Sequence, residues 1–286
     1  MASGNMKDIK RRIKSVESTK QITKAMQLVA SSKLRKAKDR AENAKPFFDE
    51  LYNTMCEIVS DNRDVLSVFQ KKSENAHSLL VVIAGDRGLA GGFNSNVIKL
   101  AEERAAEIGK ENVSILSIGR RSVEHFRKRG YKMFGEYPGI AETVKIYIAA
   151  HIGSAIVKAF AENEIGRCEL FYTTYVSPLT QTAVSKKVLP VETIEIETEA
   201  RQLPVYEPSA EAVFNAIVPK YLAGILYSAT VDSFAAEQAA RRIAMENATD
   251  NAEQMIDDLS LRYNRARQAS ITQEITEIIG GSTAGE

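Results

Sequence analysis

Tryptophan is absent from this sequence of 286 residues, and cysteine and histidine are scarce. The two cysteines, Cys56 and Cys168, lie far apart and match no metal-binding or redox spacing, which favours a reducing compartment. The three histidines are scattered and are more typical of structural or surface positions than of ligands (His77, His125 and His151). These absences argue against a disulfide-stabilised scaffold and against a metal centre.

The sequence also lacks an uninterrupted run of about 18 apolar residues, so we expect that it does not span a membrane by itself. The segment from Met1 to Met6 is too short for a signal peptide, and no Arg- and Ser-rich transit sequence is visible. Charged residues make up 26% of the chain and hydrophobic residues 44%, a balance that is ordinary for a folded protein. The net charge of +1 indicates no class of partner.

Both ends of the chain read as very long helices, over residues 6–60 and 209–279. From Leu34 to Ile58 the apolar positions alternate in steps of three and four, which is the seam of a coiled coil. At 1.5 Å per residue the two helices would span roughly 80 and 100 Å. Ser209 is the expected N-cap of the second helix, Pro219 should kink it, and the glycine pair 280–281 should end it.

The middle of the chain has a different pattern, in which short apolar runs alternate with helical segments. This alternation predicts a small α/β layer with a parallel core. The expected strands are 79–84, 113–118, 169–176 and a region within 184–198, and the expected helices are 95–108, 121–129 and 142–162. The predicted fold is therefore α/β, with a small Rossmann-like domain (76–200) inserted between a first (1–60) and a second (209–286) helix of an antiparallel coiled coil.

Charge supports the pairing of the two terminal helices. Residues 6–45 hold thirteen basic and four acidic side chains, a net charge of +9, whereas residues 209–286 hold six basic and eleven acidic, a net charge of −5. Opposite charge favours association and adds rim ion pairs, each worth about 0–1 kcal/mol at an exposed site. The competing interpretation, an ordinary helical bundle, must find partners for helices far longer than the usual 11–12 residues or so.

The loop Gly85–Asn94 follows a strand and opens a helix, which is the setting of a phosphate-binding loop. Its spacing is wrong for both common motifs, because Arg87 and Ala90 replace required glycines and no Gly-Lys-Ser/Thr follows. No acidic residue ends the second strand to hold a ribose. A tight turn that needs glycine conformations is the simpler interpretation, and a nucleotide-dependent enzyme is the alternative.

Other chemistry finds little support in the sequence. The one cluster of acids (Glu192, Glu195, Glu197 and Glu199) has no acid–base partner nearby, so we expect no catalytic residue, cofactor or metal in this chain. The basic run Lys33–Arg40 could bind nucleic acid, but it carries no interleaved aromatic side chains, and the acidic second helix would compete for it.

Three long motifs, in order, resemble the gamma subunits of F-type ATP synthases. They are the run from Asp8 to Arg35, the loop Asp86–Asn94, and the run Glu237–Ala252 with Tyr263–Glu274. The resemblance covers residues 7–281. It implies a rotor shaft with no active site, whose paired helices sit in a ring of three alpha and three beta subunits. The α/β domain would form a foot on the c-ring beside the epsilon subunit, and proton flow would turn both.

The same resemblance implies roles for individual residues. Met26, Arg241 and Gln268 match positions that contact the beta subunits, and Tyr206 and Glu207 match the region that contacts the c-ring and epsilon. Ile275, Ile278 and Ile279 would form an apolar bearing at the apex. Each could equally be structural: Met26 a packing residue on the seam, Arg241 part of a solvated helix face, Tyr206 and Glu207 an ordinary loop, and the isoleucines a buried helix end.

Two departures from the family pattern narrow the expectation. The cysteine-bearing redox insert of the chloroplast relatives is missing, and Ala90 stands where some relatives carry cysteine. Without a transit sequence, a bacterial source is expected, with the chain held at the cytoplasmic face of the plasma membrane through the membrane sector alone.

Overall fold

The computed structural model describes residues 2–61, 67–71, 73–192 and 205–283. The chain divides into two compact units, one made of Met1–Ala30 with Arg242–Glu286 and the other of Ser31–Arg241. Unit 1 therefore contains only the two ends of the chain, and unit 2 contains the α/β layer.

Two helices dominate the chain, α1 (Ala2–Asp61) and α5 (Ala210–Thr283), as the sequence predicts. The Oγ of Ser209 accepts a hydrogen bond from the N–H of Ala212 at 3.1 Å, which confirms the predicted N-cap. The predicted end at glycines 280–281 was wrong, because α5 continues to Thr283. Glycine ends a helix only when it takes the left-handed conformation, and here both glycines keep helical backbone.

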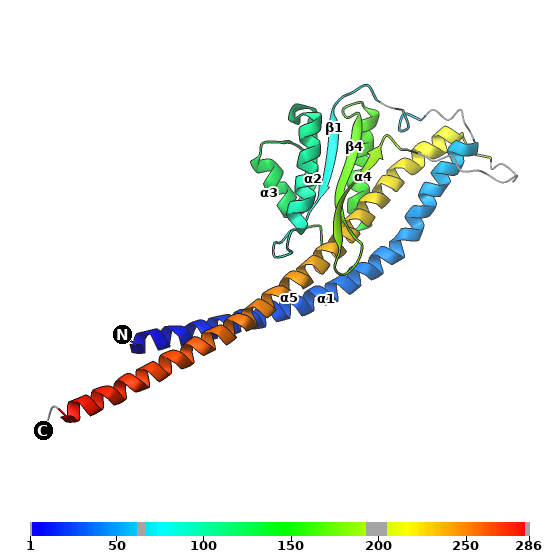
Figure 1. Cartoon of the computed structure of the whole chain (residues 1–286). Helices are drawn as coiled ribbons and strands as arrows, with labels where there is room; N and C mark the ends of the chain where they lie inside the picture. Colours follow the sequence, from blue (N-terminus) through cyan, green and yellow to red (C-terminus); the bar gives the residue numbers. More distant parts are fainter. Residues whose placement is uncertain (1, 62–66, 72, 193–204, 284–286) are drawn as a thin grey trace. The chain divides into compact units, whose positions relative to one another are not determined.

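Figure 1 labels β1 and β4 of the sheet, whose strand order is β3-β2-β1-β4-β5. β1 (Ser78–Ile83), β2 (Val113–Ile118), β3 (Lys132–Tyr137) and β4 (Arg167–Tyr175) are parallel, and β5 (Gln181–Leu189) pairs antiparallel with β4. The predicted parallel core is therefore confirmed. Sequence reasoning missed β3, because its residues Lys-Met-Phe-Gly-Glu-Tyr form no apolar run and it lies at the sheet edge with little burial.

The remaining helices connect the strands close to the predicted positions. They are α2 (Phe93–Ile108), the short 3-10 turn η1 (Lys110–Asn112), α3 (Arg120–Lys128) and α4 (Ile146–Ala161). α4 begins four residues later than predicted, and β5 begins three residues earlier than the predicted 184–198 region. Residues 193–198 of that region lie outside the described residues, and so do Glu195, Glu197 and Glu199 of the acidic cluster.

The two faces of the sheet bury separate hydrophobic clusters because side chains alternate along a strand. Leu79, Val81 and Ile83 of β1 pack with α4, α5 and the end of α1, whereas Leu80 and Val82 pack with α2 and with Phe126 of α3. Burial on both faces explains why β1 reads as a nearly continuous apolar run and why every residue of β2 is buried, its two serines included.

The first part of α5 is a core helix of unit 2. Every residue from Tyr221 to Leu226 is buried, and this part joins the cluster under the sheet. By length and composition alone, a window of α5 within Ala210–Gln273 could cross a membrane, but half of that window is buried inside the protein. Burial against the sheet accounts for its apolar composition.

The two long helices pair antiparallel within each unit. In unit 1, Lys20 and Thr23 of α1 contact Glu253 and Thr249 of α5, respectively. In unit 2, Phe48 packs near Tyr227 and Tyr52 stacks on Tyr221, with centroids 6.3 and 5.7 Å apart. In both units residue numbers fall along α5 as they rise along α1, as predicted.

The close approach of α1 to α5 depends on a glycine, which gives a first prediction. A Cβ added at Gly224 would lie 2.0 Å from Cδ1 of Phe48. Gly224→Ala should lower the free energy of unfolding by about 1–3 kcal/mol through overpacking, although alanine is the better helix former. Urea unfolding of the isolated chain measures this loss.

The same substitution in a Phe48→Ala background is the control. Once the ring is gone, Gly224→Ala should be neutral or stabilising by up to about 1 kcal/mol, which is the helix preference of alanine over glycine. Equal losses in both backgrounds would contradict the packing explanation.

Candidate functional site

The candidate site is the junction where residues 232–241 of α5 meet the sheet and the loop Gly85–Asn94, all within unit 2. Asp232 makes the first attachment: one carboxylate oxygen accepts from Thr174 Oγ1 at 2.7 Å and the other from the N–H of Tyr175 at 3.1 Å. The adjacent Ser233 Oγ accepts from the N–H of Thr173 at 3.4 Å. These bonds fix α5 to the end of β4.

A buried ion pair makes the second attachment, one turn further along α5. Arg241 Nη2 donates to Glu237 Oε1 at 2.5 Å and to the carbonyl of Gly88 at 3.1 Å. The side chains of Arg241 and Glu237 are only 10% and 6% exposed. The carboxylate of Glu237 lies directly on the loop, since a Cβ added at Gly85 would be 2.8 Å from its Cδ. Any side chain at position 85 would force the buried carboxylate of Glu237 to move.

The loop is closed by its own side chains. Asn94 Oδ1 accepts the N–H of Gly85 at 2.8 Å, and Asn94 Nδ2 donates to the carbonyl of Arg87 at 3.1 Å. Asp86 Oδ1 accepts the N–H groups of Arg120 and Gly139 at 2.8 and 2.6 Å. Side chains therefore occupy backbone donors that a phosphate would need, and two carboxylates, of Asp86 and Glu237, would repel it. The geometry supports the structural interpretation of this loop over nucleotide binding.

Burial sets the electrostatics of the junction. It raises the pKa of Asp232, while the hydrogen bonds from Thr174 and Tyr175 oppose the rise. Burial also raises the pKa of Glu237, against the attraction of Arg241, and Asp86 and Glu142 add to the rise. Both acids are held in place by donors rather than exposed to a substrate.

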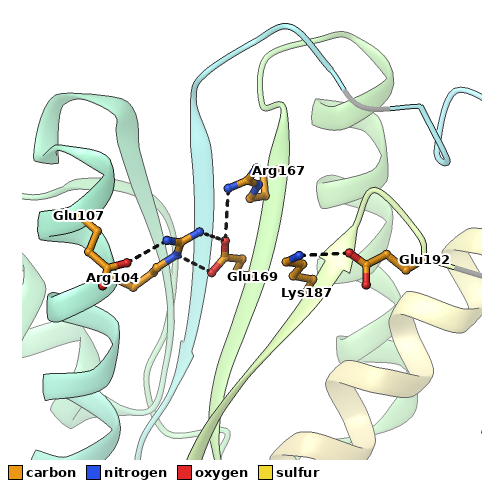
Figure 2. A network of polar contacts seen from close by, with 6 residues as sticks. All are labelled: Arg104, Glu107, Arg167, Glu169, Lys187 and Glu192. Atoms are coloured by element: carbon orange, nitrogen blue, oxygen red, sulfur yellow. Dashed lines mark hydrogen bonds and ion pairs between the residues drawn. The ribbon is translucent and has the colours of Figure 1, made fainter.

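A second polar network joins α2 to β4 (Figure 2). Arg104 donates from Nε and Nη2 to the two oxygens of Glu169 at 2.9 and 2.8 Å and from Nη1 to Glu107 at 2.9 Å. Arg167 lies 3.8 Å from the same Glu169, which is 5% exposed. These carboxylates raise the pKa of Arg104 further above its ordinary value. Glu107 and Glu169 are both paired with arginine, so this network holds α2 on the sheet and leaves neither acid poised for hydrolysis.

The residues with predicted roles fall in both units. Met26 is half-buried and Gln268 exposed in unit 1, whereas Arg241 is buried in the junction of unit 2, not on a solvated helix face. Tyr206 packs against the sheet core and Glu207 is exposed. Ile275 and Ile279 are 52% and 59% exposed, and the side chain of Ile278 lies outside the described set. The predicted contacts with other subunits stay predictions.

Sequence reasoning missed Asp232 with its partner Thr174, and it missed Glu237, the partner of Arg241. The usable signal was a pair of acids inside an otherwise small and apolar stretch, Asp-Ser-Phe-Ala-Ala-Glu-Gln-Ala-Ala. A buried acid must have donors nearby, so acids on the buried stripe of a helix indicate a polar attachment.

The raised pKa of Asp232 predicts a pH dependence of stability. Because the folded protein binds this proton more tightly than the unfolded chain, the stability contribution of Asp232 should fall as pH rises from about its ordinary pKa of 3.8 through the raised folded value. Asp232→Asn keeps both hydrogen bonds, with its amide donating to Thr174. It should remove the part of the loss of stability with rising pH that comes from Asp232. Urea unfolding at a series of pH values from pH 3.5 to pH 8 measures it.

The matched control is Asp257→Asn, because Asp257 is exposed on the same helix. It should leave the dependence of stability on pH unchanged over the same series. An Asp232→Asn variant with the same pH dependence as the unsubstituted chain would contradict the assignment.

The buried ion pair gives a third prediction. Arg241→Ala strands the carboxylate of Glu237 and should cost about 3–5 kcal/mol of unfolding free energy. Arg241→Ala with Glu237→Gln should cost less, because no charge remains buried. Lys158→Ala breaks an exposed pair with Glu162 (73% and 53% exposed) and should cost about 0–1 kcal/mol in the same chemical unfolding assay. Equal losses of unfolding free energy for Arg241→Ala and Lys158→Ala would contradict a stabilising role of the buried ion pair.

Comparison with known proteins agrees with this architecture. A family model described as ATP synthase matches residues 5–284. The ATP synthase gamma chain of Ruminococcus albus is 54% identical over 281 residues, covering 97% of this chain and 98% of that one. The sodium ion specific gamma chain of Acetobacterium woodii is 41% identical and covers 98% of each chain.

Solved structures agree as well. A chain of the central stalk and c-ring structure of the Tetrahymena thermophila mitochondrial ATP synthase aligns with a TM-score of 0.63 at 25% identity, covering 79% of this chain and 99% of that one. A chain of the Euglena gracilis mitochondrial enzyme shares the fold, with a TM-score of 0.67 at 18% identity over 99% and 95%. The fold and the sequence identity over nearly the whole chain lead to the same conclusion. The chain belongs to the ATP synthase gamma chain family, and it is a central shaft subunit of that complex rather than its catalytic subunit.

Proposed function

We propose that this chain is the rotating shaft that couples proton-driven turning of a c-ring to ATP synthesis, and to hydrolysis in reverse, on a ring of three alpha and three beta subunits. The observation that supports this most directly is the junction of α5 with the sheet. The helix that leaves the α/β layer is held there by two polar attachments and a buried seam, at Asp232 and at Glu237 with Arg241. A force on the sheet is thereby delivered to α5.

The attachments suit a mechanical role because they are directional. Packing between Ala90, Phe93 and Ala236 resists separation, but apolar contacts are indifferent to small sliding. Hydrogen bonds and the ion pair lose their geometry within less than 1 Å or so, and therefore resist rotation of α5 on the sheet. We infer that the α/β domain acts as the foot and transmits torque at this junction.

The remaining partner contacts are assigned on the same basis. Met26, Gln268 and the exposed tenth of the Arg241 side chain would meet the beta subunits. Tyr206 and Glu207 would meet the c-ring and epsilon. Exposed isoleucines at the end of α5 (Ile275 and Ile279) suit an apolar bearing, which Ile278 would complete. The division into 1–60, 76–200 and 209–286 follows the same roles: first shaft helix, foot and second shaft helix.

We also infer the placement in the cell. The chain would be peripheral to a bacterial plasma membrane, on its cytoplasmic side, and held there by the membrane sector. The burial of the apolar part of α5 within unit 2 supports attachment through partners rather than insertion.

Co-expression with the alpha and beta subunits tests the assembly. Native mass spectrometry should find one copy of this chain for three of each, and the complex should sustain ATP hydrolysis that the isolated chain lacks. Nucleotide turnover by the isolated chain, without assembly, would overturn the proposal in favour of an enzyme built on the Gly85–Asn94 loop.

The beta contact at Gln268 gives a fourth prediction. Since Gln268 is exposed, Gln268→Ala should change the stability of the isolated chain by no more than about 0.5 kcal/mol. In the complex it should lower the rate of ATP hydrolysis. Arg265→Ala, at another exposed position on the same helix, is the matched control for a nonspecific surface effect. Unchanged hydrolysis with Gln268→Ala would remove this residue from the contact.

A further inference from the structure

In unit 1, two threonine hydroxyls meet in the buried seam between α1 and α5. Thr23 Oγ1 and Thr249 Oγ1 are 2.7 Å apart, and the two residues are 8% and 7% exposed. One turn away, Lys20 Nζ lies 2.7 Å from Glu253 Oε1 at the rim of the same seam. We call these four residues the polar layer.

Each threonine hydroxyl of the polar layer also lies within hydrogen-bond distance of a carbonyl in its own helix. Thr23 Oγ1 lies 3.0 Å from the carbonyl of Lys20, and Thr249 Oγ1 lies 2.7 Å from the carbonyl of Met245. Each hydroxyl has a single proton, so one threonine donates into its own helix and the other can donate across the seam. The cross-seam bond exists only at one axial position of α1 against α5.

The fully buried apolar neighbours hold that position only weakly. The buried residues of unit 1 near the layer are small or flexible, namely Ala30, Met245 and Ala252. Alanine offers little interdigitation and methionine adapts its shape, so such a seam yields easily to sliding. Sliding by one helical turn, about 5.4 Å, would break the hydroxyl bond and separate Lys20 from Glu253 together. Single polar positions in coiled-coil seams are known to set register in this way.

We propose that the polar layer is a shear lock, in which Thr23 and Thr249 act as positioning residues that keep α1 and α5 from sliding past each other under torque. This rests on the shaft role proposed above. Twisting a pair of helices loads them in shear along their common seam, and the polar layer is a directional element there. Its loss should leave the fold and ATP hydrolysis intact and reduce the work delivered for each ATP.

The test is Thr23→Val with Thr249→Val in the complete ATP synthase reconstituted in proteoliposomes. The valines keep the side-chain shape, and replacing both partners of a buried hydrogen bond leaves neither unsatisfied. The midpoint temperature of thermal unfolding should therefore be unchanged or higher. ATP hydrolysis should stay near that of the unsubstituted complex, while ion pumping per ATP falls. Thr23→Ser with Thr249→Ser keeps both hydroxyls and should restore pumping.

A matched control uses threonines that bond only within their own helix. Thr19 and Thr276 are exposed and lie 3.1 and 2.8 Å from the carbonyls of Ser15 and Thr272. Thr19→Val with Thr276→Val removes the same number of hydroxyls from the same two helices. It should leave pumping per ATP unchanged.

A structural readout separates sliding from other causes. Spin labels at Glu17→Cys and Asp257→Cys, both exposed positions, report the axial offset of the two helices in the complex. The native Cys56 and Cys168 are buried and therefore protected from the label. The valine pair should broaden the label distance distribution, and the serine pair should not. Thr23→Cys with Thr249→Cys, whose sulfurs would lie within reach of a disulfide, should narrow it when oxidised with diamide.

The outcomes distinguish this inference from the proposed function. A valine variant with unchanged pumping per ATP and an unchanged label distribution overturns the shear lock. An unsubstituted complex in which hydrolysis drives no pumping overturns the shaft role itself.

Discussion

The structure of unit 2 depends on how one helix is held against one sheet. α5 enters as a core helix under the sheet, and from Asp232 onward it also carries polar attachments, beside the buried Phe234 and the small Ala235 and Ala236. Small residues bury little area and interlock weakly, so packing alone holds this stretch less firmly. Asp232, Glu237 and Arg241 add directional contacts there. The loop at Gly85 is shaped by the same demand, since its glycine makes room for a carboxylate.

The same logic recurs in unit 1 on a smaller scale. There the seam has no sheet beneath it, and its buried residues are again small or flexible. Two hydroxyls and one ion pair provide contacts that depend on the axial position of the helices, which small apolar residues do not provide. A protein whose task is to carry force needs few reactive groups, but it needs contacts whose energy changes steeply with displacement. Polar groups that are buried and fully satisfied have that property.

Sequence periodicity predicted the two long helices and the parallel strands because both patterns extend over many residues. The alternation at Leu34–Ile58 and the apolar runs at β1 and β2 each reflect burial that repeats along the element. β3 escaped because an edge strand with Gly135 and Glu136 buries too little to leave a pattern. The junction escaped for another reason: a hydrogen bond between Asp232 and Thr174 joins residues 58 apart, and no local pattern encodes it. The motif at Gly85–Asn94 was visible, but its meaning required the partner that fills it.

Arg241 shows how a family motif and a structure can assign different work to one residue. The resemblance places it against a beta subunit, and the structure commits one of its nitrogens to Glu237 and Gly88. A guanidinium has five donors, and the bonds of Nη2 leave others unused, but with 10% of the side chain exposed a partner carboxylate would reach them only if Arg241 turned outward. The two roles would then be coupled: a partner that draws Arg241 outward would weaken its hold on Glu237, whose burial already disfavours its charge. Arg241 would thus serve both the contact with a beta subunit and the attachment of α5 to the α/β domain. A change in one contact would alter the strength of the other.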